Sequence, residues 1–413
     1  MTASHASKES SSQELEVEEE GELRKSLTLW NAVNMMIGTV IASGIFVSPG
    51  GVQKEAGSVG LSLSIWLFAG VFSAMLAWCY AELGTLIRRS GGDYVYIREA
   101  FGPFLGFLRF WIEAMIVYPG SCTVVALTFA TYILRPFFPH GPPAYSVELV
   151  AAAVIVLLTA VHCVSVRAFT CLQDAFSLTK IFALLSIILP GVFLLLRGHE
   201  ENLESFREPW ANSTSSPGHI VLGCYSAFFA FGGFNCLNYV VGELKDPGRT
   251  LPLAILISSV VITIVYLLAN VSFYAVLSPA EMLQSDAMAL DFAQKIFGPL
   301  AFLMPLFVAI AVLGCANGLI FSTSRLFFAG AKEGQLPAVL AFVHPRTRTP
   351  LPAVLAMGVL SVAYLGLSSN VYALINYMAV NYWLSIAASL AALLFFRVQR
   401  PEAERVVKPS AFS

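Results

Sequence analysis

Charged residues are scarce in this sequence. Asp, Glu, Lys and Arg make up 12% of its 413 residues, whereas 57% are hydrophobic. Soluble domains carry about a quarter charged residues, so this composition excludes an ordinary soluble protein. The formal net charge of -2 is also small, which argues against a nucleic-acid partner held by bulk charge. The sequence therefore predicts an integral membrane protein embedded in a lipid bilayer.

The sequence also lacks the motifs of metal, redox and catalytic sites. Its seven cysteines lie in or beside apolar runs without a Cys-x-x-Cys pair, and no His or acidic cluster has metal-ligand spacing. Neither a disulfide framework nor a metal site is predicted. We find no phosphate-binding Gly-rich loop, no Ser-His-Asp arrangement and no paired carboxylates. We therefore expect neither an enzyme nor an ATP-driven pump, and no cofactor.

The first 25 residues are polar, Ser-rich at the start and acidic from Glu14 to Glu22. Such a segment cannot bury enough apolar surface to fold alone, so residues 1–25 are predicted to form a disordered tail. The segment has neither the basic start nor the apolar middle of a signal peptide. We therefore expect the first membrane span to be retained and the tail to stay in the cytosol.

Ten apolar runs are long enough to cross a bilayer at about 20 residues per crossing. They lie near residues 28–49, 61–86, 104–134, 146–166, 171–196, 218–242, 252–277, 298–327, 350–367 and 371–396. If these spans alternate in direction, basic residues are about three times as common on one side as on the other. This asymmetry predicts that both termini are cytosolic.

Small residues interrupt two of these runs near the middle of the membrane, at residues 38–46 and 229–235. The two interruptions are five spans apart, which divides the chain into two five-helix repeats, 26–200 and 217–397, before a cytosolic tail at 398–413. Glycines in one span most simply allow close helix packing. Matching interruptions in both halves instead favour a transporter whose discontinuous helices form a binding site.

The two interruptions predict the chemistry of the ligand. A helix that begins after a break offers free N–H groups and a positive dipole end, whereas a helix that ends before it offers carbonyl oxygens. An α-amino acid carries both a carboxylate and an ammonium group. We expect the carboxylate at the amides around Ser43 and Gly44, and the ammonium group at nearby carbonyls. The predicted substrate-binding residues are Val40, Ser43, Gly44, Phe229, Ala230, Gly232 and Asn235.

Side chains near the second break indicate the preferred substrate. Asn235 is neutral, whereas an acidic residue there would favour a cationic substrate, so we expect neutral amino acids. Phe229 precedes the break and is a candidate gate, although an aromatic residue in a span is usually part of the packing. Weaker candidates for the pocket are Ser121, Val125, Phe234, Cys236 and Trp383.

Three charged residues lie inside predicted spans. Lys180 in the fifth span is costly to bury and is therefore a functional candidate, with snorkelling to the interface as the alternative. Its ammonium group could stand where a sodium-coupled transporter binds its cation. Glu82 and Glu113 are each expected to pair with an Arg that the sequence leaves open. The turn at 88–94 is expected to help an inner gate.

A polar loop on the non-cytosolic side contains a possible modification site. Asn212 begins an Asn-Ser-Thr sequence, the acceptor pattern for N-glycosylation. The tripeptide could also occur by chance, and its closeness to the sixth span could keep it out of reach. We retain Asn212 as a candidate.

Seven stretches resemble the light chains of the heteromeric amino-acid transporters, in the amino acid/polyamine/organocation superfamily. They are residues 38–49, 79–85, 90–94, 173–176, 232–235, 251–255 and 324–328. The similarity is closest to the L-type neutral branch. It implies an all-α LeuT-type fold, a 5+5 inverted repeat with discontinuous helices 1 and 6. It also implies sodium-independent exchange of neutral L-amino acids in the plasma membrane, an aromatic gate at Phe229 and Lys180 at the sodium position.

The sequence departs from this family in three places. Ala42 replaces the first glycine of the Gly-Ser-Gly break. Gly141 stands where the family has the cysteine that links it to a single-span glycoprotein heavy chain, so such a partner would be held non-covalently. Ten spans are predicted where the family has twelve. A broader-range amino-acid exchanger and a truncated, non-transporting partner of a transporter complex therefore stay open as alternatives.

Overall fold

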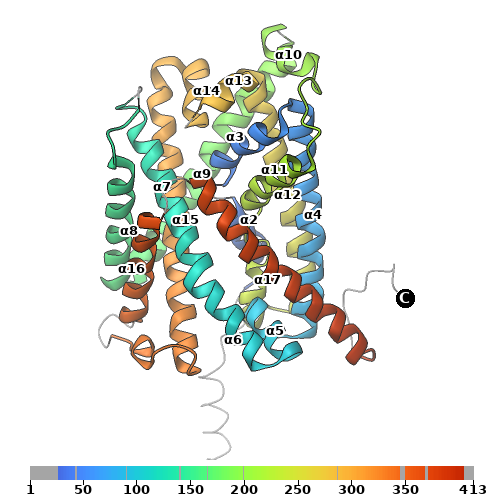
Figure 1. Ribbon diagram of the computed structural model, residues 1–413, viewed down its shortest axis with the longest axis vertical. Coiled ribbons are helices and arrows are strands. Elements are labelled where there is room, and N and C mark those ends of the chain that lie inside the picture. Colours follow the sequence, from blue (N-terminus) through green and yellow to red (C-terminus); the bar gives the residue numbers. More distant parts are fainter. Residues whose placement is uncertain are drawn as a thin grey trace, which may run out of the picture.

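The computed structural model describes residues 27–41, 44–89, 91–138, 141–164, 166–198, 200–285, 287–344, 349–367 and 371–403. Long helices form a bundle with shorter helices at both ends (Figure 1). In this part of the chain, seven helices are long and apolar enough to cross a membrane, or eight if one bent pair counts as a span. The predicted all-α membrane fold is confirmed, while the predicted tail at 1–25 lies outside the described residues.

The helices follow the predicted order of spans. The first half contains α2 (Leu29–Val40), α3 (Gly44–Ala56), α4 (Val59–Leu86), α5 (Gly92–Phe101), α6 (Pro103–Ile112), η1 (Glu113–Val117), α7 (Tyr118–Leu134), α8 (Ser146–Val164) and α9 (Val166–Arg197). The second half contains α10 (Glu200–Arg207), α11 (Pro217–Ala230), η2 (Cys236–Tyr239), η3 (Val241–Glu243), α12 (Pro247–Val276), α13 (Pro279–Gln284), α14 (Met288–Phe297), η4 (Gly298–Phe302), α15 (Leu303–Lys332), η5 (Ala338–Ala341), α16 (Leu351–Leu367) and α17 (Val371–Gln399).

Two of the ten predicted spans are shorter than a full crossing. The sixth is represented by α11, which has 14 residues and ends at the predicted break. The ninth is α16, an apolar helix of 17 residues. A lipid environment offers no water to free backbone groups, so an incomplete helix needs partners from its neighbours. The end of α11, where the sixth span is interrupted, therefore needs hydrogen-bond partners from the surrounding helices.

Both predicted helix interruptions are present. The axes of α2 and α3 differ by 49°, and α11 is followed by turns and the 3-10 helix η2. The structure also has a third irregularity that the sequence did not predict. It is η1, a single π-helical turn between α6 and α7. Such π-turns occur often at functional sites in otherwise regular helices.

The two ends of the bundle differ in their short helices. Figure 1 shows α5 and α6 at one end and α10, α13 and α14 at the other, and we call these the α5 end and the α10 end. At the α5 end, Tyr94 donates a hydrogen bond of 2.5 Å to Glu333, which also pairs with Arg98 at 3.0 Å. Burial and this hydrogen bond raise the pKa of Tyr94. These contacts join α5 to the segment after α15.

The partner of Glu82 is Arg397, near the end of α17. The Arg397 Nε lies 3.0 Å from Glu82 Oε1, and a second guanidinium nitrogen contacts Oε2. Glu82 is almost fully buried, whereas Arg397 is one-fifth exposed. Two parallel bonds between a guanidinium and a carboxylate fix their relative orientation. The pair thus fastens the end of α17 to the end of α4.

We expect Glu82→Gln to lower the thermal stability of the purified protein. Removing one partner of a buried ion pair costs about 3 kcal/mol or more, because the remaining charge loses the opposite charge that offset its burial. The double variant Glu82→Gln/Arg397→Gln should recover part of that loss. The measurement is the melting temperature in detergent, and a single variant as stable as the wild type would contradict the expectation.

Candidate functional site

The two helix interruptions lie against each other. A Cβ atom at Gly44 would lie 2.4 Å from the Cα of Ala230, so a side chain at Gly44 would collide with the backbone of α11. Figure 1 shows α3 and α11 side by side, and the two helices pack against each other. A glycine is required here because the start of α3 meets the end of α11 at backbone distance.

One tyrosine on α12 connects the two breaks. The Tyr266 hydroxyl lies 2.8 Å from the carbonyl oxygen of Val40 and 3.0 Å from that of Ala230. These carbonyls belong to the last residues of α2 and α11, where helical partners run out. A hydroxyl has a single proton, so its hydrogen bond is shared by the two carbonyls or alternates between them. Sequence reasoning missed Tyr266, which lies in an apolar run.

The predicted binding residues are distributed over this junction. Val40, Gly44 and Ala230 are brought together, and Ser43 lies outside the described residues. Beyond the break, the Gly232 N–H donates to the Phe229 carbonyl at 3.2 Å within a turn. A carbonyl oxygen has two lone pairs, so these contacts leave acceptor capacity for a ligand.

Asn235 faces the α5 end of the second break and is 5% exposed. Its amide nitrogen lies 3.4 Å from Asp93 Oδ2, and Asp93 also accepts a hydrogen bond of 2.9 Å from Ser389 on α17. Asp93 is fully buried in the first turn of α5. From the sequence we expected Asp93 to lie in a turn that helps an inner gate. We did not predict its contact with Asn235.

The partner of Glu113 is Arg109, one helical turn before it. Arg109 Nη2 lies 3.3 Å from Glu113 Oε1 and 2.8 Å from Asp93 Oδ2. The hydroxyl of Tyr239, at the end of η2, donates a 2.5 Å hydrogen bond to the same Glu113 oxygen. We call Asp93, Arg109 and Glu113 the charged cluster. The i to i+4 spacing of Arg109 and Glu113 was the feature of the sequence that could have identified this ion pair.

Lys180 lies inside the bundle and is 4% exposed. Its ammonium nitrogen donates a 3.1 Å hydrogen bond to the carbonyl of Gly38 in α2. A Cβ at Gly314 of α15 would lie 3.4 Å from Lys180 Cε. The lysine therefore connects α9 to the helix that leads into the first break, with α15 alongside.

The aromatic candidates occupy different surroundings. Trp383 packs on Phe228 and Phe72, with ring centroids 4.6 and 6.0 Å apart. Phe234 instead packs edge-on against Tyr80 at 5.7 Å. Among the described residues, no ring pair includes Phe229, which is half-buried. Phe228, which sequence reasoning missed, is therefore the residue of this pair that packs on Trp383.

The remaining pocket candidates come from α7 and η2. The Ser121 hydroxyl contacts the sulfur of Met378 at 3.9 Å, and Val125 is buried one helical turn further along α7. Cys236 is half-buried at the start of η2, and its N–H donates to the Gly233 carbonyl at 3.0 Å. Ser121 and Val125 therefore share one helix, and Cys236 comes from a second element.

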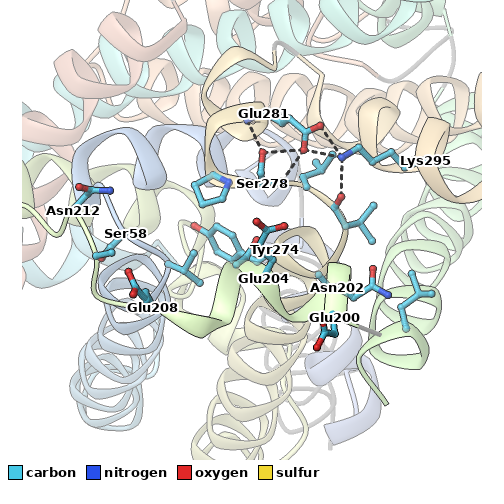
Figure 2. Close-up of a pocket in the computed structure, with 18 of the residues that line it drawn as sticks. Ser58, Glu200, Asn202, Glu204, Glu208, Asn212, Tyr274, Ser278, Glu281 and Lys295 are labelled. Atoms are coloured by element: carbon cyan, nitrogen blue, oxygen red, sulfur yellow. Dashed lines mark hydrogen bonds and ion pairs between the residues drawn. The ribbon is translucent and has the colours of Figure 1, made fainter. Parts of the chain in front are cut away.

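An open cavity of about 1310 Å³ lies at the α10 end, away from the breaks. Figure 2 shows the carboxylates of Glu200, Glu204 and Glu208 along one side of it and the Glu281–Lys295 pair along another. The hydrogen bond from Lys295, followed by the Ser278 N–H, lowers the pKa of Glu281. With four glutamates and one lysine in its lining, the cavity has an excess of acidic side chains.

Two loop residues singled out from the sequence also lie outside the bundle core. Asn212 is exposed on the rim of this cavity, with a left-handed φ of 63°. Gly141 lies in the exposed connection between α7 and α8 with a φ of 106°, and an added Cβ would meet open space. Pro139 and His140, which precede it, lie outside the described residues.

Comparisons with known proteins agree with this architecture. The family model described as amino acid permease matches residues 27–412. Over 395 residues, the chain is 43% identical to the large neutral amino acids transporter small subunit 2 of Rattus norvegicus, covering 94% of this chain and 73% of the relative.

Two further relatives carry different substrate names. The human Asc-type amino acid transporter 1 is 41% identical over 387 residues, covering 94% of this chain and 74% of its own length. The cystine/glutamate transporter of Pongo abelii is 38% identical over 396 residues, covering 96% of this chain and 78% of its own. With the match over nearly all the described helices, the chain belongs to the amino acid permease family and, within it, to the light chains of the heteromeric amino-acid transporters.

Proposed function

We propose that this protein exchanges neutral L-amino acids across a membrane by alternating access, without sodium. The observation that carries the proposal is the position of the Tyr266 hydroxyl between the carbonyls of Val40 and Ala230. Two interrupted helices that end at one point offer a ligand both acceptors and donors inside an apolar bundle. The names of the relatives, transporters of large neutral amino acids among them, agree with this chemistry.

The substrate is held by its backbone groups. Its ammonium group binds the carbonyls of Val40 and Ala230, with those of Phe229 and Gly232 nearby, at the negative dipole ends of α2 and α11. Its carboxylate binds the N–H groups at the start of α3, at Gly44 and the preceding Ser43. The closeness of Gly44 to Ala230, where an added Cβ would lie 2.4 Å from the Ala230 Cα, supports this assignment, because the start of α3 and the end of α11 meet there.

The substrate side chain extends toward a surface without a free charge. Asn235 is neutral, and its amide already binds Asp93, which itself is paired with Arg109. A charged side chain would be left without a partner there, so neutral amino acids are preferred. Ser121, Val125, Phe234, Cys236 and Trp383 are the further pocket candidates.

Lys180 replaces a bound sodium ion. Its buried ammonium group donates to the Gly38 carbonyl, close to the first break, so a fixed positive charge is present there. A second cation beside it would be repelled at short range in a medium of low dielectric constant. This arrangement supports exchange that does not depend on sodium.

The protein lies in the plasma membrane with the α5 end in the cytosol. The excess of basic residues on that side of the predicted spans supports this orientation. The α10 end, with Asn212 as a glycosylation acceptor, then faces the outside. A glycoprotein heavy chain associates without a disulfide at Gly141, because glycine has no thiol.

Counterflow in liposomes tests the proposed exchange. Liposomes that contain the purified protein and unlabelled leucine should accumulate labelled leucine, and replacing external sodium by choline should not change the rate. Competition by neutral amino acids should exceed that by acidic or cationic ones. Equal competition by glutamate or arginine would support the broader exchanger, and no exchange with any preloaded amino acid would support a non-transporting partner.

Tyr266→Phe tests the clamp. The variant retains the ring packing against Trp66 at 5.8 Å and Phe231 at 4.9 Å but loses the hydroxyl between the carbonyls. One lost hydrogen bond is worth about 1 kcal/mol, so we expect the KM for leucine to change several-fold. Tyr274→Phe is the matched control on α12, since its hydroxyl binds Gln53 and Ser62 instead. Equal effects of both variants on KM would contradict the clamp.

Phe229→Ala and Phe228→Ala separate gating from packing. As the gate, Phe229 should be needed for exchange, and its removal should lower the melting temperature less than removal of Phe228, because Phe229 packs against the core without a described ring partner. Phe228→Ala should lower the melting temperature, because Phe228 packs on Trp383 at 4.6 Å. Full exchange by a folded Phe229→Ala variant would rule out the gate.

A further inference from the structure

The charged cluster contains two carboxylates and only one guanidinium. Arg109 lies between Asp93 and Glu113, at 2.8 and 3.3 Å from their nearest oxygens. The side chains of all three residues are at most 5% exposed. If both carboxylates were ionised, the cluster would hold one uncompensated negative charge inside the bundle. Such a charge is far more costly in an apolar environment than in water.

The hydrogen bonds of the cluster are unevenly distributed. Asp93 accepts from Arg109, Ser389 and Asn235, so both of its oxygens have donors. Glu113 accepts from Arg109 and Tyr239 through Oε1. Its buried Oε2 has no hydrogen bond of ordinary geometry among the described residues, and the Tyr118 hydroxyl is the remaining polar group beside this carboxylate. An ionised carboxylate oxygen without a donor is unfavourable in an apolar interior, and a proton on that oxygen removes the charge that burial penalises.

We propose that Glu113 is a proton-binding site, with the proton on Oε2 while the cluster is buried. The proposal rests on the proposed exchange of amino acids, because it assigns a second ligand to the same transport cycle. One proton balances the cluster at zero net charge. Asp93, with donors on both oxygens, remains the ionised partner of Arg109.

No other cation balances Glu113 among the described groups that face it. The side chains around it are Arg109 and Tyr118 on its own span, Asp93 from α5, Tyr239 from η2 and Tyr382 from α17. From α16, Tyr364 binds the carbonyl of Met115 in the π-turn. Four further cations of the neighbouring helices are engaged elsewhere. Arg98 of α5 pairs with Glu333, and Arg397 of α17 binds Glu82. Arg325 and Lys332 of α15 lie over Phe321 and Phe328.

The cluster is connected directly to the second break. Asn235 lies in the turn after α11 and donates to Asp93, and Tyr239 at the end of η2 donates to Glu113. Movement of this segment away from α5 and η1 would expose Glu113 to water at the α5 end. The Oε2–H bond then breaks and the proton passes to that water, and closing the cluster takes a proton back. One O–H bond forms and one breaks in each cycle, without any redox step.

Infrared spectroscopy of the protein in lipid tests the site directly. At neutral pH the wild type should have the C=O stretch of a buried protonated carboxylic acid. The band should be absent from Glu113→Gln and shifted in frequency in Glu113→Asp, which retains an acid if the amide variant does not fold. The control Glu82→Gln/Arg397→Gln should keep the band, because that carboxylate has its own guanidinium. No band in the wild type, or one that only Asp93→Asn removes, would overturn the proposal.

Transport measurements then test coupling. The wild-type exchange rate should depend on the pH at the α5 face, with a limiting slope of about tenfold per pH unit for a single proton. Glu113→Gln should flatten this dependence, and an unchanged slope in the folded variant would overturn coupling at Glu113. If the band is present but no amino acid exchanges, the proton site stands and the proposed function fails. If exchange occurs without the band, only the proton site fails.

Discussion

The absence of water around backbone groups inside a bilayer is the constraint on which this structure depends. Helices α2 and α11 both end within the bundle, so their last carbonyls need donors from other elements. Tyr266 supplies one hydroxyl to two such carbonyls, those of Val40 and Ala230. One donor for two acceptors partners both carbonyls while leaving lone pairs at the place where a ligand with several N–H donors would bind.

The same constraint governs the buried charges. Glu82 and Arg397 balance one another, and the ammonium group of Lys180 donates to a carbonyl of α2. The charged cluster around Arg109 differs, because two carboxylates share one guanidinium. The π-turn η1 begins at Glu113, so this irregularity falls at the residue whose charge lacks a full counterpart. Charge imbalance and backbone irregularity therefore occur together.

Local patterns predicted the helices but not the contacts between them. Apolar runs and small-residue interruptions located the spans and both breaks, because length and glycine content are properties of one segment. The partner of Glu82 is 315 residues away, and Asn235 meets Asp93 across 142 residues. In the sequence, Tyr266 looks like an ordinary packing residue of a membrane span. Phe228 and Phe229 are adjacent and identical, and they differ only in the side of α11 that each occupies. These assignments need the three-dimensional arrangement of the helices.

The second break has two sets of contacts, and they connect the proposed substrate site to the charged cluster. Its α11 end binds Tyr266, whereas Asn235 and Tyr239 bind Asp93 and Glu113. A ligand that draws the Ala230 carbonyl away from Tyr266 acts on the same short segment that keeps the cluster buried. Coupling between two sites is reciprocal, so protonation of Glu113 would change the affinity for the amino acid by the factor with which the amino acid changes proton binding. Gly233, with a φ of 92°, allows the chain to turn between Ala230 and Asn235, so the carbonyl that binds Tyr266 and the amide that binds Asp93 lie at the two ends of one turn.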